Sequence, residues 1–269
     1  MRDCARAVVL AISLATAAPV LAADLPLAPP PPAPMTVSSG WHFEATIDGW
    51  APSLSANMGV GRFPTAHVQA NIFQILQHLE GIFPASVVAY NDEFIVGLDA
   101  FWVRLGLNSK FGPGTFGGVT ASTTINEAFV TGYGGVRLPI GSPNLNLYGI
   151  VGARYFNLNG SLTLQTPVFG FTRSASQGKD WVDPIVGLVA RYRIDDKWFV
   201  KAETDFGGYS GNATAQGFAA VGYDWNASLS TSLGYRLLYV YEQQSNNFNG
   251  SFRVQQIMHG PEIDMSLKF

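Results

Sequence analysis

The sequence predicts an all-β fold, a closed antiparallel transmembrane β-barrel of about ten strands with one short helix in its first long loop. Three observations predict it. The chain begins with a leader for export, it alternates apolar and polar residues from Trp41 to its end, and after residue 40 it has no apolar run of the roughly 18 residues that a spanning helix needs. Because only helices and closed barrels satisfy their backbone hydrogen bonds in lipid, such a chain is expected to close into a barrel. Eight and twelve strands are the alternatives.

The first 40 residues predict export. The short basic stretch MRDCAR is followed by the apolar run AVVLAISLATAAPVLA, which ends on small residues and is typical of a cleaved signal peptide, assigned to residues 1–22. Residues 23–40 carry a run of prolines and are expected to form a periplasmic spacer that cannot join a sheet. The barrel domain then covers residues 41–269. The single cysteine, Cys4, lies in the leader, so no disulfide is expected to stabilise the exported protein.

The composition favours a membrane environment. Charged residues make up 13% of the chain, against the roughly 25% that a water-soluble domain carries, and aromatic residues also reach 13%. A net charge of −3 gives no indication of a nucleic-acid partner. We therefore expect outer-membrane lipid as a partner and no nucleic acid, while a secreted soluble barrel is the alternative.

Period-two alternation predicts ten strands. They span residues 41–58, 81–90, 93–107, 121–138, 145–157, 181–194, 197–207, 214–224, 228–242 and 251–269. The exception is NIFQILQHL, residues 71–79, where apolar side chains fall at helical spacing and predict a short amphipathic helix. It is expected either to fold into the mouth of the barrel or to lie on its rim.

The connectors between these strands alternate in length. The long ones are 59–80, 108–120, 158–180, 208–213 and 243–250, and the short ones are 91–92, 139–144, 195–196 and 225–227. This alternation is expected of an outer-membrane barrel that has both termini and its tight turns in the periplasm and its long loops outside.

The last strand shows the alternation up to the final residue. Its apolar positions are Ile263, Met265, Leu267 and Phe269, and the intervening positions are Glu262, Asp264, Ser266 and Lys268. We expect the first set to face lipid, the second set to face inward, and the strand to pair with residues 41–50, because an unpaired edge in lipid leaves backbone groups without partners.

Aromatic residues near strand ends predict two interfacial girdles, formed by Trp41, Trp181, Trp198, Tyr223, Trp225, Tyr239 and Tyr241.

The faces opposite the apolar ones carry charges of both signs, which are expected to pair across the lumen because a lone charge in a low-dielectric interior is costly. They are Asp99, Glu127, Arg137, Arg154, Asp183, Arg191, Arg193, Lys201, Glu203, Asp205, Asp224 and Arg236. Such a network is either an eyelet that selects solutes by charge or a structural plug. The plug is favoured, because about eight strands just fill their interior and open aqueous pores use 16 or more.

No catalytic or metal motif is recognisable. The four histidines occur in no Gly-x-Ser-x-Gly elbow or His-Glu-x-x-His helix and lack the spacing of metal ligands, so we expect no metal, cofactor or enzymatic activity. The best catalytic candidate is the pair His42 and His259, which lie on the first and last strands with Glu44 and Glu262 near them in sequence.

Three motifs follow one another in the second half of the chain: Trp-Val-Asp-Pro at 181–184, Asp-x-Gly-Gly at 205–208 and Gly-Tyr-Arg at 234–236. In this order they resemble a little-characterised family of proteobacterial outer-membrane β-barrel proteins, and the leader with AADLP and its proline run is similar to alphaproteobacterial surface-antigen barrels. Family members tend to have an acidic residue where this chain has Val88. The resemblance implies a barrel of the Gram-negative cell envelope whose terminal aromatic residue is read by the barrel-assembly machinery. It implies no activity.

The sequence therefore predicts an outer-membrane barrel with a structural or surface-exposed role, and leaves open a narrow, porin-like pore for small solutes. The alternatives are a surface-binding or adhesion protein acting through the loops 59–80, 108–120 and 158–180, and a barrel enzyme acting on lipid or peptide. The oligomeric state does not follow from the sequence.

Overall fold

The computed structural model describes residues 40–60, 66–111, 119–166, 171–246 and 250–269. The predicted signal peptide and nearly all of the predicted spacer lie outside these residues. In chain order the described elements are β1 (His42–Trp50), β2 (Ser53–Val60), β3 (Ala66–Ala70), α1 (Ile72–Gln77), β4 (Leu79–Tyr90), β5 (Phe94–Phe111), β6 (Val119–Arg137), β7 (Leu145–Thr166), β8 (Phe171–Arg193), β9 (Trp198–Gly207), β10 (Ala213–Asp224), β11 (Leu229–Asn246) and β12 (Gly250–Lys268).

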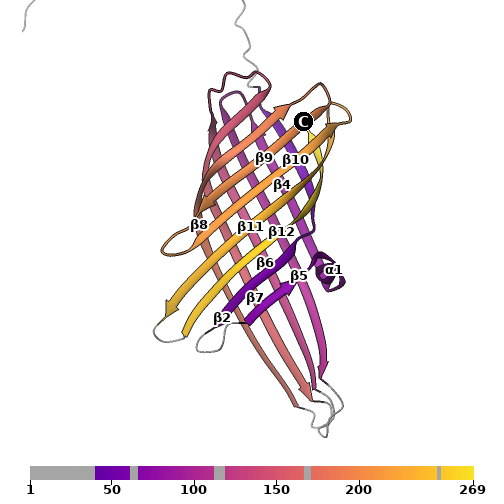
Figure 1. Ribbon diagram of the computed structural model, residues 1–269, viewed down its shortest axis with the longest axis vertical. Coiled ribbons are helices and arrows are strands. Elements are labelled where there is room, and N and C mark those ends of the chain that lie inside the picture. Colours follow the sequence, from indigo (N-terminus) through magenta and orange to yellow (C-terminus); the bar gives the residue numbers. More distant parts are fainter. Residues whose placement is uncertain (1–39, 61–65, 112–118, 167–170, 247–249) are drawn as a thin grey trace, which may run out of the picture. The chain divides into compact units, whose positions relative to one another are not determined.

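Antiparallel backbone pairing closes these strands into a barrel (Figure 1). From β4 to β12 each strand pairs with the next, and β1 pairs with both β4 and β12. The strand β2 continues β1 along β12 without a change of register, since Trp50 lies opposite Glu262 and Ser53 opposite His259. On the other side of this stave, β3 pairs with β2 and β4 pairs with β1, with α1 between them. The twelve segments therefore form ten staves, which confirms the predicted strand number.

One end of the barrel carries the short connectors, and the C-terminus lies at this end (Figure 1). Three of these turns begin with Asn91, Asp195 and Asn226, whose side-chain oxygens accept hydrogen bonds from the backbone amides two and three residues further on. Asn and Asp favour turns for this reason. We call this end the short-turn end.

At the opposite end, the hairpins are longer than the sequence indicated. The pairing of β7 with β8 continues to Thr166 and Phe171, so most of the predicted connector 158–180 is strand. Likewise β5 and β6 extend through much of 108–120, and β11 and β12 through much of 243–250. These segments are rich in Ser, Thr, Gly and Asn, which favour turns and loops, although backbone pairing does not depend on side-chain type. The hairpins project beyond the rest of the wall (Figure 1).

The two faces of the wall differ in chemistry as predicted. On β12, Ile263, Met265 and Leu267 are half or more exposed on the outer face, whereas Glu262 and Asp264 are 1% exposed on the inner face. The terminal Phe269 is bound to the first strand, because its amide donates to the Phe43 carbonyl and the two rings stack. Within the described part of the chain, no helix is long and apolar enough to cross a membrane.

The predicted helix is present as α1. Asn71 caps its N-terminus and forms a capping box with Gln74, in which each side chain bonds to the other's backbone amide. The helix lies at the side of the barrel, and not across its mouth (Figure 1). Register explains this position: α1 is an insertion in a stave, between the part that pairs with β2 and the part that pairs with β1.

Candidate functional site

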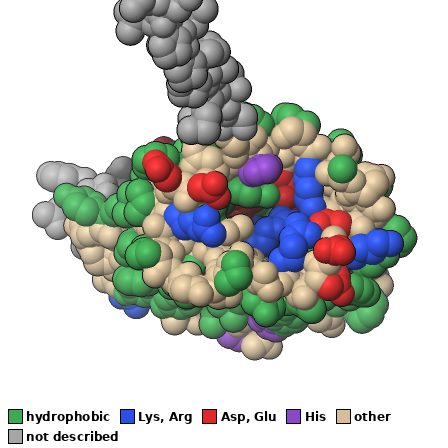
Figure 2. Space-filling model, turned by 90° about the horizontal axis from the view of Figure 1, so that it is seen from above, with side chains coloured by type: hydrophobic (Ala, Val, Ile, Leu, Met, Phe, Trp, Pro, Cys, Tyr) green, Lys and Arg blue, Asp and Glu red, His purple; other side chains and the backbone are tan. Residues whose placement is uncertain are grey.

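The inner faces of the staves line a cavity of about 110 Å³ toward the short-turn end. One side of it is apolar and aromatic, with Val88, Ile95 and Tyr133, whereas the other side carries charged side chains such as Lys201 and Glu203. Figure 2 shows basic and acidic side chains gathered in a hollow at this end of the molecule. Alternation places them there, because every second residue of each strand points into the lumen.

A first group of ion pairs lies at the entrance of this cavity. Arg191 from β8 contacts Glu44 from β1 at 2.9 Å across the lumen. Asp224 from β10 is paired with Arg193 at 3.3 Å and with Lys268. The predicted Arg137 lies at the same end, where it bonds to Asp92 at 3.1 Å and to Asn146 at 2.6 Å and does not join the central network.

A second group lies deeper and is centred on Arg236 of β11. Its guanidinium contacts Asp99 of β5 at 2.8 Å and Glu262 of β12 at 2.5 Å, so it joins opposite walls of the barrel. In the same region, Lys201 of β9 contacts Asp264 at 2.8 Å. The Ser232 hydroxyl also donates to Asp264.

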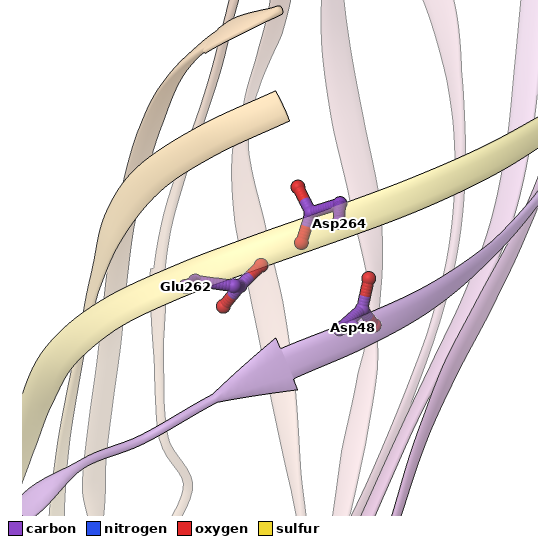
Figure 3. A group of neighbouring side chains, drawn as sticks. All are labelled: Asp48, Glu262 and Asp264. Atoms are coloured by element: carbon purple, nitrogen blue, oxygen red, sulfur yellow. The ribbon is translucent and has the colours of Figure 1, made fainter. Parts of the chain in front are cut away.

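Three carboxylates meet beside these cations. Asp48 of β1 and Glu262 and Asp264 of β12 bring oxygen atoms within 4.8 Å of one another (Figure 3). Asp48 and Asp264 are direct cross-strand partners. Because like charges directly opposite each other are destabilising, Arg236 and Lys201 are needed to offset this cluster, and we regard it as part of the lumen network.

A third group surrounds Arg154, which is completely buried. Its guanidinium donates to Asp205 at 2.6 Å, to the Thr131 hydroxyl at 2.9 Å and to the Thr214 hydroxyl at 3.0 Å. These partners come from β6, β9 and β10, so one side chain ties together the inner faces of several staves. Such charge-assisted bonds are the strong class of hydrogen bonds.

An apolar layer fills the lumen next to these charges. We call it the aromatic septum, and it consists of Trp50, Phe101, Phe129, Phe156, Trp181, Leu238 and Met258. Four ring contacts with centroid distances of 5.0 to 6.1 Å run from Trp50 on β1 to Trp181 on β8. Leu238 and Met258 complete the layer from β11 and β12. Phe129 and Leu238 have no exposed surface, so solvent does not reach the centre of the septum.

The septum corrects one prediction. Trp181 is not a girdle residue, because it stacks on Phe156 inside the barrel and its indole nitrogen donates to Asp183 at 3.2 Å. The strand β8 begins ten residues before it, at Phe171, so Trp181 is not at a strand end. It lies two residues from the buried Asp183 and shares its inward face.

The remaining girdle residues lie elsewhere. Trp198, Tyr223 and Trp225 form an edge-to-face cluster at the short-turn end, with centroid distances of 5.1 and 5.0 Å. Tyr239 and Tyr241 alternate with buried inward residues and are partly exposed, as is Trp41, which precedes β1.

Other predicted charges lie beyond or beside the septum. Glu127 is bonded to the Gln256 amide, and Glu203 accepts a hydrogen bond from Gln216 at 3.1 Å. Lys179 pairs with Glu242. Neither Lys179 nor Glu242 was singled out in the sequence, because Lys179 lies in a segment taken for a loop.

Sequence reasoning also left Glu44 and Asp48 out of the network. Their signal was present, since Glu44, Thr46, Asp48 and Trp50 alternate along the first strand and are all buried. Glu262, Asp264 and Lys268 were predicted to face inward but were not assigned partners.

The histidine pair does not form a site. His42 lies at the short-turn end and stacks on Tyr90, whereas His259 is exposed and its Nδ1 is bonded to the Tyr235 hydroxyl at 2.6 Å. The strand β12 pairs with β1 near Lys268 and with β2 at His259, nine residues away, which is about 30 Å along a strand. Adjacent strands therefore do not bring these side chains together.

Comparison with known proteins supports the architecture. No known family model matches the chain, and no curated protein matches its sequence. Among solved structures, the outer membrane protease OmpT from Escherichia coli is similar, with a TM-score of 0.57 and 11% identity over 86% of this chain and 98% of that one. The chain has the fold of an outer-membrane β-barrel protein. At this identity the likeness concerns the fold alone.

Weaker similarities exist to the translocator domain of NalP from Neisseria meningitidis and to Ail, the attachment invasion locus protein of Yersinia pestis. The NalP domain gives a TM-score of 0.40 at 11% identity over 87% of this chain and 90% of that one. Ail gives a TM-score of 0.34 at 12% identity over 86% of this chain and 99% of that one.

Proposed function

We propose that the protein spans the Gram-negative outer membrane as a closed barrel with a structural, surface-exposed role. Its outer wall supports the membrane assignment. Ile47, Val151, Phe206, Leu233 and Ile263 come from different staves, and each is more than 60% exposed. A soluble barrel with such a surface would aggregate, whereas lipid chains cover it favourably.

The orientation follows from the ends of the barrel. With short turns and the C-terminus in the periplasm, the long hairpins project outside the cell. On this proposal residues 1–22 are the cleaved signal peptide and residues 23–40 the periplasmic spacer. The resemblance of the stretch from Trp181 to Glu242 to little-characterised proteobacterial barrels fits this assignment.

The aromatic septum is the observation that favours a closed barrel. A solute entering from the short-turn end would reach the cavity and then meet Phe101 and Phe129, packed against Leu238 from the far wall. The ion pair of Arg236 with Asp99 crosses the lumen in addition, and the pair of Arg154 with Asp205 links β7 to β9 inside it. Opening a path would require separating packed rings and desolvating paired charges, and both are costly.

Solute uptake by proteoliposomes tests this proposal. Wild-type protein is expected to admit no more small sugar or amino acid than empty liposomes do. The double variant Phe101→Ala/Phe129→Ala removes two rings of the septum and is expected to admit solute, while Phe206→Ala, on the outer face, is the matched control. Uptake through the wild-type barrel would refute the closed state.

A narrow pore is the second candidate, and the cavity of about 110 Å³ favours it. Its lining carries charges of both signs. In that case charge-reversing changes at its entrance, such as Arg191→Glu, should alter the selectivity of uptake. If uptake is absent in the wild type, this candidate fails.

The surface role is assigned to the projecting hairpins. In the hairpins β5–β6 and β7–β8, antiparallel backbone pairing continues where the strands project beyond the barrel wall. These paired strands offer extended, rigid surfaces to a binding partner. Shortening β7 and β8 by deletion of residues 160–177 should leave the barrel folded. If cells expressing this variant adhere to surfaces and host matrix as wild-type cells do, and neither adheres more than cells without the protein, the adhesion alternative is excluded.

We propose no enzymatic activity, since His42 and His259 lie far apart.

A further inference from the structure

We propose that a small apolar cavity in the barrel wall behind α1 binds the end of one acyl chain of a membrane lipid. The inference rests on the proposed membrane location. It begins with a gap in backbone pairing. β1 pairs with β4 up to Ile47 and Ala85, and the next residue on β4 is Pro84, which has no amide hydrogen to donate.

Beyond this point the two parts of the stave separate. Residues 79–84 of β4 pair with β5 only, and β3 pairs with β2 only. Among the described residues no backbone pairing joins residues 48–53 to residues 79–84 of β4, so the wall has a lateral seam there. Unpaired strand edges in lipid are costly unless something covers them, and α1 lies at this seam.

The helix is suited to contact with hydrocarbon. Its six residues, IFQILQ, carry no charge. Ile75 is buried against the barrel, whereas Phe73 is 72% and Leu76 53% exposed. In water such side chains would be unfavourable, but at a membrane surface they are stabilising.

Neighbouring residues place the seam at the edge of the apolar belt. Phe83 and Trp102, a cross-strand pair on the outer wall, are exposed and apolar. Two residues further along β5, Arg104 forms an exposed ion pair with Glu80 at 2.8 Å. The change from aromatic to charged side chains marks the boundary between hydrocarbon and the polar interface.

Behind the helix lies a small cavity of about 40 Å³. Its wall is almost entirely apolar and includes Trp50, Leu54, Ile82, Phe101, Val103 and Met258. Ile82 shares the inward face of Val103 yet is 38% exposed, which shows that the wall is open beside it. Glu127 is the one ionisable residue of the lining, and its carboxylate is already bonded to Gln256.

The chemistry of the cavity selects its occupant. Water needs two to four polar partners in a buried site, whereas the side chains of this lining are apolar except for the Glu127 carboxylate and the Trp50 indole nitrogen. An empty apolar void forfeits dispersion contacts with its lining. The medium beside the seam is the acyl region of the bilayer, so an alkyl chain can enter between α1 and β4 with its headgroup left at the interface.

Quenching of tryptophan by lipids brominated on the acyl chain tests the proposal. Three variants of the full chain keep a single tryptophan, Trp50, Trp102 or Trp181, and carry phenylalanine at the other five positions. Each is reconstituted in phosphatidylcholine vesicles with or without bromine. Trp102 faces the bilayer, Trp50 lines the cavity, and Trp181 belongs to the septum but not to the cavity lining.

We expect brominated lipid to reduce the emission of Trp50 to an extent comparable with that of Trp102 and to leave Trp181 unaffected. Adding Val103→Phe, which fills the cavity, should remove the quenching of Trp50 alone. If Trp102 is quenched and Trp50 is not, or if Trp50 remains quenched after Val103→Phe, the cavity does not hold a chain although the barrel spans the membrane. If Trp102 is not quenched either, the membrane location itself fails.

Discussion

Arg154 offers a quantitative test of how the lumen stabilises the barrel. The change Arg154→Met keeps most of the volume of the side chain and removes its charge and three hydrogen bonds. It leaves the Asp205 carboxylate, 2% exposed, without its cation, and the Thr131 and Thr214 hydroxyls without their donor.

The magnitude follows from this burial. Removing one partner of a buried ion pair typically costs about 3–5 kcal/mol, because the other charge remains buried and uncompensated. The exposed pair of Arg104 and Glu80 supplies the control, with side chains 49% and 46% exposed. Arg104→Met should cost about 1 kcal/mol or less.

Urea unfolding in lipid vesicles, followed by tryptophan fluorescence and by the mobility of unheated protein on gels, measures both changes. The double variant Arg154→Met/Asp205→Leu should recover much of the loss, because a buried pair replaced by apolar residues is often neutral. Equal costs for Arg154→Met and Arg104→Met would refute the assignment of Arg154 to the buried network. So would a double variant no more stable than Arg154→Met.

Three further predictions concern single residues. Trp181→Ala should destabilise the barrel by about 3 kcal/mol, as expected for a large aromatic removed from a packed interior, whereas Trp225→Ala should cost roughly 1 kcal/mol for its ring contact with Tyr223; similar unfolding midpoints would argue against the inward position of Trp181. The amides of Trp198 and Lys197 donate to Asp195 and lower the pKa of this carboxyl below its ordinary value of 3.8, so its contribution to stability is present above that value and is lost as the pH falls through the lower folded pKa. The difference in unfolding midpoint between wild type and Asp195→Ala should therefore shrink in acid, and a difference independent of pH down to 2 would contradict the turn geometry. Deleting Phe269, which we propose as the assembly signal together with Ile263, Met265 and Leu267, should impair insertion, and a normal amount of folded protein in the outer membrane after the deletion would refute that role.

Alternation along the chain was sufficient to predict ten strands, although β3, inside the predicted connector 59–80, was missed. It worked because residues such as Ile263 and Asp264 must face opposite environments, so a shift of one residue would place every side chain wrongly. The outer halves of β7 and β8 were missed because they are rich in Ser, Thr, Gly and Asn, which favour turns and loops, whereas their pairing rests on backbone hydrogen bonds.

The sequence predicted which charged side chains point into the lumen, but not which of them form ion pairs. All twelve predicted charged residues lie on inward positions, yet which of them meet depends on the stagger between strands. Arg154 on β7 reaches Asp205 on β9, past the intervening β8, and Arg236 reaches Asp99 from the opposite wall. Knowing which strands are neighbours does not give the stagger between them. For the same reason, the predicted proximity of His42 and His259 was wrong.

Single-channel recording in planar bilayers tests most directly the central claim that the aromatic septum and the lumen ion pairs close the barrel. After insertion of purified wild-type protein the account predicts no discrete conductance above the bare bilayer, with steps appearing only when Phe101 and Phe129 are both replaced by alanine. Stable conductance steps from the wild-type protein would contradict it.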